Sequence, residues 1–251
     1  MRTTQLFGNE ICAGDHRSLA RSLLQAMARG PKSVFFCNAH MLMLSREDEA
    51  LAAAMVAADM VFADGVPVAW LQRRSGAPDA DVLRGYEAVE LICGETAGSD
   101  RKIGFLGSTE HVLAGLSKSL RERYPSLSID YLHSPGMIND VIQPEGELIA
   151  QINGKNLHCL FVGLGCPKQE KWVQEYAPHL NCSLLAVGAA FDWLAGTTRK
   201  PPEWMEKSGL AWLFRLIENP AKMWHRYLIY NTKFMLASFK LLTWDKWTAN
   251  G

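Results

Sequence analysis

The run from residue 160 to 200 constrains the fold more than any other part of the chain. In LFVGLGCPKQEKWVQEY an apolar segment ends at Gly163 and Gly165, and Pro167 takes the first position of an expected helix. A second apolar segment, residues 184–187, leads into the small residues of GAAFDWLAG. A helix that starts directly after a strand presents free backbone N–H groups, which suit an anionic ligand such as a diphosphate. Two such transitions close together predict one ligand crevice at the carboxyl ends of parallel strands.

Short apolar runs alternate with helical patterns along most of the chain. Strands are expected at residues 33–37, 60–63, 102–106, 128–132, 156–162 and 184–187. Helices are expected at residues 46–57, 66–74, 86–96, 110–123, 145–153 and 167–176. The strands are continuously apolar, a pattern that is typical of a parallel sheet buried on both faces. The chain is therefore predicted to be an α/β protein with helices on both faces of the sheet.

The bulk composition narrows the class of protein. The 251 residues carry 26 basic and 26 acidic side chains, so charge alone does not indicate a nucleic-acid-binding protein. None of the six cysteines forms a C-x-x-C pair, which favours a reduced, cytosolic protein over a zinc site or a disulfide framework. The N-terminus lacks the apolar core of a secretory signal, and no stretch approaches the ~20 apolar residues of a transmembrane helix.

The composition changes after Gly196. Residues 207–251 contain seven basic and two acidic side chains, and five of the eight tryptophans lie from residue 204 onward. The pattern is helical, with a break expected at Asn219 and Pro220. Basic and aromatic residues on amphipathic helices fit attachment to an anionic membrane surface. Packing of the same aromatic residues onto the rest of the protein is an equally good interpretation.

Asp64 is the first candidate for chemistry. It follows an apolar strand directly, in ADGVP, and a carboxylate at the carboxyl end of a strand points into the crevice of such a sheet. Partial burial there would raise its pKa and suit it to general-base catalysis. The alternative, which the spacing alone favours, is that Asp64 caps a helix beginning near Val66.

Other polar residues near strand ends allow more than one interpretation. Asn38 ends the preceding strand and fits a ligand contact and a helix cap equally well. His40 is a candidate general base, although a lone histidine beside a helix start is more often structural. Asp79 and Asp81 spell D-x-D, which holds divalent ions in many nucleotide-sugar enzymes, but no apolar strand precedes them and we interpret them as a solvated turn.

Three further turns offer groups to an anionic ligand. Gly107 and Ser108 lie in a strand-to-helix turn, which is a weak signal by itself. Lys168 and Gln169 either reach back to a phosphate or ribose, or form a solvated first turn. Asp192 lies between two aromatic residues and needs a partner, either a backbone N–H or a ligand. The absence of HExxH, GxSxG and Walker A motifs argues against metalloprotease, α/β-hydrolase and P-loop classes.

Six segments together resemble the WecG/TagA/CpsF glycosyltransferases, also called glycosyltransferase family 26. The segments are CNAHMLML, ADMVFADGVPVAW, IGFLGSTEHVL, VGLGCPKQEKWV, VGAAFDWLAGTTRKPPEWM and GLAWLFRLIENPAKMWHRY. The resemblance implies a Rossmann-like core over residues 1–200 and a membrane-associating helical appendage over residues 201–251. It also implies inverting transfer of a sugar from a UDP-sugar to a polyprenyl-diphosphate-linked saccharide, with no metal ion and no cofactor.

The resemblance further implies a cytoplasmic protein, peripheral on the inner face of the bacterial cytoplasmic membrane. Relatives suggest self-association, for which the apolar helices around residues 41–57 and 66–71 would provide a surface. The basic C-terminal segment would close over the sugar donor and stabilise the departing UDP. Deletion of the residues after about Trp204 is then expected to abolish transfer and to leave a folded core.

The resemblance also assigns residues to the site. The family's proposed base matches Asp64, its asparagine for the sugar donor matches Asn38, the glutamine of PKQE matches Gln169, and the aspartate of FDxxAG matches Asp192. The other residues expected to bind substrate are Arg84, Gly107, Ser108, Gly165, Lys168, Arg215, Lys222 and Arg226.

The chain departs from the family pattern at several places. Phe36 stands where threonine is frequent in the family. The family pattern R-x-x-G-x-D is replaced by VLRGYE, so Arg84 lies out of register and Glu87 replaces the aspartate. At residues 200–202 the chain has KPP in place of R-A-P. Glucose, N-acetylmannosamine and its uronic acid remain alternative donor sugars, with exopolysaccharide assembly favoured. A nicotinamide-dependent oxidoreductase, which would lack its G-x-G-x-x-G motif, and a non-enzymatic sugar-nucleotide sensor or scaffold are the competing classes.

Overall fold

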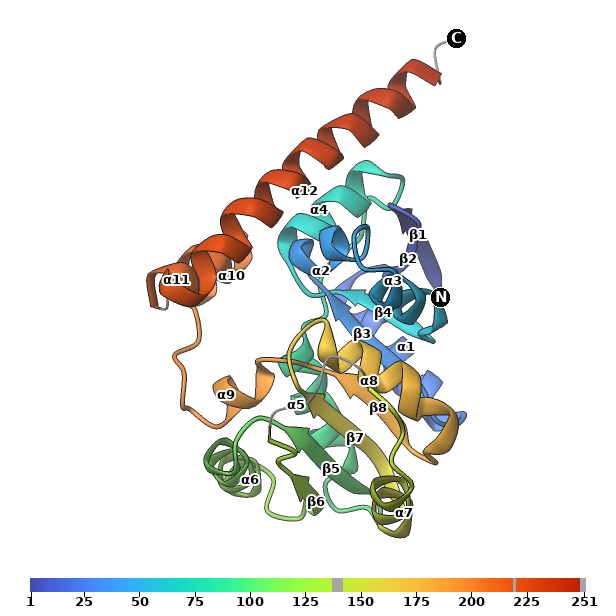
Figure 1. The fold of residues 1–251 in the computed structure, drawn as a ribbon, viewed down its shortest axis with the longest axis vertical. Helices are drawn as coiled ribbons and strands as arrows, with labels where there is room; N and C mark the ends of the chain where they lie inside the picture. Colours follow the sequence, from blue (N-terminus) through green and yellow to red (C-terminus); the bar gives the residue numbers. More distant parts are fainter. Residues whose placement is uncertain (137–141, 219, 249–251) are drawn as a thin grey trace.

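A single mixed sheet forms the centre of the computed structural model. The structure describes residues 1–136, 142–218 and 220–248. In the last helix it describes the side chains of residues 220, 221, 224 and 228–243. The strand order is β1-β2-β4-β3-β8-β7-β5-β6 (Figure 1). The strands are β1 (Arg2–Leu6), β2 (Asn9–Ala13), β3 (Ser33–Cys37), β4 (Met60–Ala63), β5 (Lys102–Gly107), β6 (Ser128–His133), β7 (Leu157–Gly163) and β8 (Ser183–Ala186). Every neighbouring pair is parallel except the β1–β2 hairpin. The predicted α/β class is confirmed.

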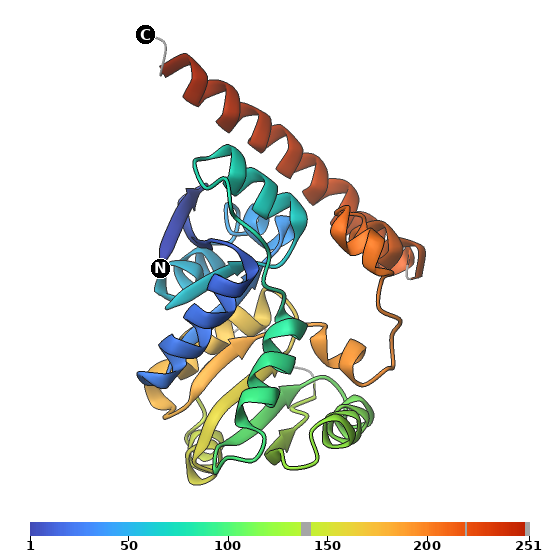
Figure 2. The same ribbon diagram turned by 180° about the vertical axis from the view of Figure 1, so that it is seen from behind.

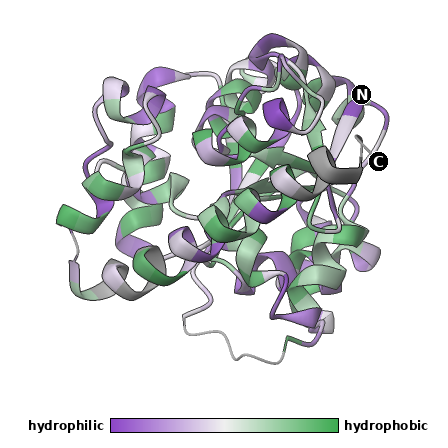
Figure 3. Cartoon of the chain, turned by 90° about the horizontal axis from the view of Figure 1, so that it is seen from above, coloured by the Kyte–Doolittle hydropathy of each residue, from purple (hydrophilic) through white to green (hydrophobic). Residues whose placement is uncertain are grey.

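Helices cover both faces of the sheet (Figures 1 and 2). One face carries α1 (His16–Ala28), α5 (Gly85–Thr96), α6 (Glu110–Arg123) and α9 (Ala190–Leu194). The other carries α2 (Ala39–Leu44), α3 (Glu49–Ala57), α4 (Val66–Arg74), α7 (Gly146–Gly154) and α8 (Lys168–Tyr176), which runs into a short 3-10 turn, Ala177–His179. Seen from above, apolar strands lie at the centre and helices of mixed hydropathy surround them (Figure 3). The continuous apolar runs of the strands thus reflect burial on both sides.

Two boundaries differ from the sequence prediction. The helix expected at residues 46–57 begins only at Glu49 as α3, with Asp48 as its cap, and a separate helix that was not predicted, α2, precedes it with Asn38 as its cap. The Asn38 Oδ1 atom accepts from the Met41 N–H at 3.1 Å, and the Asp48 Oδ1 atom accepts from the Leu51 N–H at 3.0 Å. Pro167 also lies one position earlier than predicted, at the N-cap of α8, because the helix begins at Lys168.

The first 28 residues contain structure for which the sequence analysis made no prediction. β1 and β2 form a hairpin whose turn is Phe7 and Gly8, both with positive φ, as a two-residue hairpin turn requires. The hairpin adds to the sheet beside β4, and α1 follows with Asp15 as its cap. The apolar side chains of Leu6 and Ile11 are fully buried, so the hairpin is part of the core.

The C-terminal segment forms three helices, α10 (Glu203–Lys207), α11 (Ala211–Glu218) and α12 (Pro220–Thr248). The expected break at Asn219 falls on a residue outside the described part, between α11 and α12. α12 runs across α2, and its C-terminal end extends beyond the body of the protein (Figure 1). Phe234 and Ala237 of α12 are buried in the core cluster that includes α2. None of the described helices combines the length and apolarity needed to cross a membrane.

Burial also bears on the surface suggested for self-association. Most apolar side chains of α2 and α4 already pack inside a single chain, among them Met41, Leu42, Val68 and Leu71. Val56, at 74% exposure, remains outside on α3. Self-association through these helices remains a prediction.

Close packing at Gly163 gives a test of the fold. A Cβ atom at Gly163 would lie 2.6 Å from the ring of Phe191, which is fully buried. We therefore expect Gly163→Ala to lower the free energy of unfolding by about 1–3 kcal/mol, because the ring must move within a packed core. Gly146→Ala is the matched control, since nothing lies within 4 Å of its added Cβ. Chemical denaturation measures both variants, and equal stability of the two would contradict the packing described.

Candidate active site

A cleft of about 450 Å³ lies where the carboxyl ends of β3, β4, β7 and β8 meet. This volume falls in the range of small-ligand sites. The structure brings six of the predicted site residues together around it, from five different segments. They are Asn38, Asp64, Gly165, Gln169, Asp192 and Arg215. A cleft thus lies at the carboxyl ends of the parallel strands, where the sequence predicted one.

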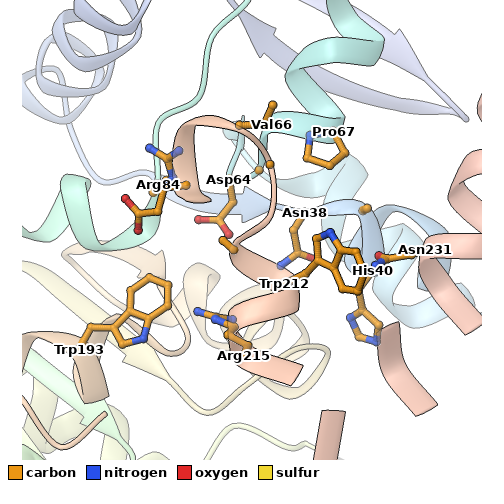
Figure 4. Close-up of a pocket in the computed structure, with 15 residues that line it drawn as sticks. Asn38, His40, Asp64, Val66, Pro67, Arg84, Trp193, Trp212, Arg215 and Asn231 are labelled. Atoms are coloured by element: carbon orange, nitrogen blue, oxygen red, sulfur yellow. The ribbon is translucent and has the colours of Figure 1, made fainter. Parts of the chain in front are cut away.

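Asp64 directly follows β4 and faces this cleft. Its backbone N–H bonds to the Cys37 carbonyl at 2.9 Å, which extends the pairing of β3 and β4 by one residue. Its Oδ1 atom accepts from the Gly85 N–H at 3.2 Å. The capping interpretation is wrong, because Gly65 occupies the N-cap of α4 and no side chain caps that helix. The carboxylate is therefore held by the start of α5, and Figure 4 shows it in the pocket that borders this cleft.

The electrostatic surroundings of Asp64 suit a general base. Removal from water raises the pKa of its carboxyl above the ordinary value. The positive charge of Arg215, the hydrogen bond from Gly85 and the charge of Arg84 lower the pKa, in that order, while Glu87 raises it. The net direction is upward. A carboxylate with a raised pKa accepts a proton more readily than an exposed one.

Arg215 reaches the cleft from α11. Its guanidinium carbon lies 4.2 Å from the centre of the Trp193 ring, a cation–π distance (Figure 4). Trp193 in turn meets the ring of Tyr86 edge-on, with 5.6 Å between centroids. Among the groups that lower the Asp64 pKa, Arg215 has the largest effect. The C-terminal segment thus contributes a cation beside the candidate base.

Buried contacts fix α10 to the core. The Tyr86 hydroxyl donates to the Glu206 Oε2 atom at 3.1 Å, and the Lys200 ammonium lies 3.7 Å from the centre of the Tyr86 ring. Lys200 also lies 3.9 Å from the Glu206 Oε2 atom. Glu206 is buried, so a tyrosine hydroxyl and an ammonium group compensate its charge. Burial, followed by the charges of Glu87 and Glu206, raises the pKa of Tyr86.

Arg84 and Glu87 form a pair at the start of α5. The Arg84 Nη1 atom lies 2.9 Å from the Glu87 Oε1 atom, and the Glu87 Oε2 atom accepts from the Arg84 backbone N–H at 2.8 Å. The pair lies beside Asp64, and Arg84 also lines the pocket shown in Figure 4. The residues that break the family pattern here are therefore at the site, where Glu87 orients Arg84.

Gln169 is not the solvated first-turn residue that was one of its two expected environments, while contact with a ligand remains a prediction because Gln169 lines the cleft. It is 4% exposed, and its Oε1 atom accepts from the Gly165 N–H at 3.1 Å. Its Nε2 atom donates to the Glu170 Oε1 atom at 2.8 Å and to the Ala186 carbonyl at 3.3 Å. Gln169 thus joins the end of β7 to the end of β8, and it occupies a backbone N–H that the sequence analysis expected to be free.

Gly107, Ser108 and Lys168 were predicted to bind substrate but do not line the cleft. Gly107 and Ser108 are at the end of β5, on the same edge of the sheet, but Gly107 packs against Gly163 and neither lines the cleft. Lys168 is half-buried and does not line it either. The side chains of Lys222 and Arg226 are outside the described part of α12. Their roles remain predictions.

Asp192 and the pair Asp79 and Asp81 have different surroundings. The Asp192 carboxylate lines the cleft and has no hydrogen-bond partner among the residues the structure describes, so a ligand remains the predicted partner. Asp79 pairs with Arg2, and the Asp81 Oδ1 atom accepts from the Val82 N–H at 2.8 Å. Both are exposed, in agreement with a solvated turn. Across the described ranges, no cluster of three or more His, Cys, Asp or Glu side chains has a metal-binding arrangement.

The sequence analysis missed three residues near Asp64: Trp212, Asn231 and Glu206. All three line a second pocket that borders the cleft (Figure 4). They come from α11, α12 and α10, and the only signal that favoured them was the compositional change toward basic and aromatic residues after Gly196.

Comparison with known proteins identifies the family. The chain matches the sequence model of the glycosyl transferase WecG/TagA/CpsF family over residues 4–248. A similar curated protein from Bacillus spizizenii is 26% identical over 178 residues, which cover 70% of this chain and 66% of that protein. One from Bacillus subtilis is 27% identical over 172 residues, which cover 68% of this chain and 64% of that protein. One from Staphylococcus aureus is 26% identical over 161 residues, which cover 64% of this chain and 61% of that protein. Each of them is named N-acetylglucosaminyldiphosphoundecaprenol N-acetyl-beta-D-mannosaminyltransferase. The chain spans slightly less than two thirds of the length of these relatives. The match over nearly all of its residues places this chain in the glycosyl transferase WecG/TagA/CpsF family.

Proposed function

We propose that this protein is an inverting glycosyltransferase that moves a sugar from a UDP-sugar to a polyprenyl-diphosphate-linked saccharide. The observation that carries the proposal is Asp64, a carboxylate with a raised pKa at the carboxyl end of β4, with the cation of Arg215 beside it. The names of the similar proteins supply the acceptor class, a saccharide on a polyprenyl diphosphate. N-acetylmannosamine is then the first donor sugar to test, with glucose and N-acetylmannosaminuronic acid as alternatives.

The proposed reaction is a single displacement. The Asp64 carboxylate removes the proton of an acceptor hydroxyl while the hydroxyl oxygen forms a bond to the anomeric carbon. The bond from that carbon to the β-phosphate oxygen breaks on the opposite side, so the configuration inverts and UDP leaves with the electron pair. Negative charge grows on the diphosphate, and we propose that Arg215, which lines the cleft, stabilises it. We propose that this charge is balanced by protein groups without a metal ion.

The proposed location follows from the acceptor, because a polyprenyl chain resides in a membrane. We propose a peripheral attachment to the inner face of the cytoplasmic membrane through α12. Four apolar side chains of α12, at intervals that place them on one helical face, are more than half exposed. They are Trp224, Leu228, Met235 and Phe239. An apolar stripe on a helix with basic neighbours suits the interface of an anionic bilayer.

The test is UDP release from a panel of UDP-sugars, with and without N-acetylglucosaminyl diphosphate carried on a short polyprenyl chain. We expect release that depends on the acceptor, from one donor in the panel, at a rate that EDTA does not change. Binding of UDP-sugars with no release for any acceptor would favour a sugar-nucleotide sensor instead. Loss of activity in EDTA, restored by a divalent ion, would overturn the metal-independent mechanism and leave the transfer reaction standing.

A further inference from the structure

Asp64 lies at the junction of two cavities, not at the bottom of one. The first is the cleft at the strand ends, whose far wall consists of the β7–α8 and β8–α9 junctions. The second lies under the C-terminal helices, between the start of α4 and helices α10, α11 and α12. Four residues line both cavities: Asn38, Asp64, Trp193 and Arg215. Figure 4 shows the second cavity with Asp64 and Arg215 on one side and Trp212, Asn231 and His40 on the other.

A displacement with inversion requires two approaches to one carbon atom. The attacking hydroxyl and the leaving diphosphate must lie on opposite sides of the anomeric carbon, and the base must contact the hydroxyl within hydrogen-bonding distance. A single cavity with the base at its end would not admit two substrates from opposite sides. Two cavities that meet at Asp64 meet this requirement.

The cavities differ in the chemistry that they offer. The cleft at the strand ends is lined by segments 163–165 and 187–190, whose glycines and alanines let a ligand approach the backbone closely. The second cavity has an aromatic surface at Trp212 and amide groups at Asn38 and Asn231. Flat aromatic rings flanked by a few amide groups suit the apolar faces and hydroxyl groups of a sugar ring.

Two amide groups in the second cavity are placed to bond a ligand. The Asn231 side chain is half-buried and makes no hydrogen bond to any other residue that the structure describes. Asn38 uses its Oδ1 atom to cap α2, which leaves its Nδ2 group as a donor toward the shared wall of the two cavities. Both residues line the second cavity, as Asp64 does.

We propose that the second cavity is the subsite for the terminal sugar of the acceptor, with Trp212 under the ring and Asn231 bonded to its hydroxyl groups, while the cleft at the strand ends takes the UDP-sugar. This assignment rests on the proposed glycosyl transfer. It makes Trp212 and Asn231 determinants of acceptor recognition, supplied by the C-terminal helices, and gives these helices a role beyond membrane attachment.

The test separates the two substrates by varying each concentration in turn. We expect Asn231→Ala to raise the acceptor KM about 3- to 10-fold, and Asn231→Ala combined with Trp212→Leu to raise it about 10- to 100-fold. The dissociation constant for UDP-sugar, measured by calorimetry without acceptor, should stay within twofold of wild type in both. Thr232→Ala is the matched control, because Thr232 is the exposed neighbour of Asn231 on α12 and lines neither cavity.

A substitution in the cleft at the strand ends should have the opposite effect on the two substrates. Asp192→Asn alters a residue that lines only the cleft at the strand ends, so we expect it to weaken UDP-sugar binding and to leave the acceptor KM unchanged. Trp212→Phe keeps an aromatic ring at this position, and we expect it to retain most of the acceptor affinity.

The possible results separate a wrong subsite assignment from a wrong proposed function. Acceptor-dependent transfer by wild type with an unchanged acceptor KM in the Asn231 and Trp212 variants would overturn the subsite and leave the function standing. Equal weakening of UDP-sugar binding and acceptor binding in those variants would also overturn it. Absence of any acceptor-dependent release by wild type would overturn the proposed function and the subsite together.

Discussion

Replacement of Asp64 by asparagine is expected to lower kcat for acceptor-dependent UDP release by about 10²- to 10⁴-fold, the range that general-base catalysis contributes. Asparagine has the same shape and retains an oxygen that can accept from the Gly85 N–H. It cannot take a proton at neutral pH, so the loss should fall on kcat. The dissociation constant for UDP-sugar, measured by calorimetry, should change little.

The same variant is expected to be at least as stable as wild type. Because burial raises the pKa of Asp64, the folded protein holds an ionised carboxylate at neutral pH less favourably than the unfolded chain does. Removal of that charge therefore stabilises the folded state above the ordinary carboxyl pKa, and the advantage disappears as pH falls below it. Melting temperatures at pH 7.5 and at pH 4 check the sign.

Asp81→Asn is the matched control for Asp64→Asn. Its carboxylate also accepts from a backbone N–H, that of Val82, but it lies in an exposed turn away from the cleft. We expect wild-type turnover from this variant. An Asp64→Asn protein that works within a few fold of wild type would exclude Asp64 as the base and would direct attention to His40, which lines the same pocket.

The strands and the position of Asp64 were predictable from sequence for one physical reason. β3, β4 and β8 are buried on both faces, so each is a short continuous apolar run that stands out from its surroundings. The first polar residue after such a run lies at the carboxyl edge of the sheet, where ligands bind. The apolar runs therefore predicted that Asn38 and Asp64 lie at this edge of the sheet, and left helix capping and ligand contact as alternative roles for both.

Local competition explains what the sequence analysis got wrong. Residues 46–57 have good helical composition, but the side chain of Asp48 bonds a backbone N–H and starts a new helix. Gln169 has a polar side chain in a first helical turn, which favours exposure. It is buried because a carbonyl at the end of β8 and an N–H at the end of β7 both lie within its reach. Such pairings depend on which strands are neighbours, and no spacing along the chain shows this.

The part of the site that the C-terminal helices contribute was the least predictable from the sequence. Trp193 and Arg215 are 22 positions apart, and α10, which lies between them in the chain, is fixed to α5 through Tyr86 and Glu206. Composition indicated that the C-terminal segment is unusual, and it left membrane attachment and packing as equal interpretations. The structure shows that part of α12 packs into the core. Deletion after Trp204 would therefore expose apolar surface on α2, and a single substitution at Arg215 tests the segment more cleanly.

Arg215→Ala is expected to lower kcat for transfer by about 10²- to 10³-fold, because it removes a fixed positive charge from the place where the diphosphate leaves. Arg215→Lys keeps a charge but not the planar group that lies over Trp193, and we expect it to recover part of the rate. Arg121→Ala is the control, since it removes an arginine of α6 that bonds to Ser117 and Ile129 and lines neither cavity.

The pH profile distinguishes a charge beside Asp64 from a merely structural role for Arg215. The base must be ionised, so activity falls as pH drops through the Asp64 pKa. Arg215 lowers that pKa, and the other charges acting on it, Arg84 and Glu87, remain in the variant. Arg215→Ala should therefore move the acidic limb of the kcat profile to higher pH, whereas Arg215→Lys should move it less. An acidic limb that stays in place while kcat falls would show that Arg215 acts on the leaving group or on packing and not on the base.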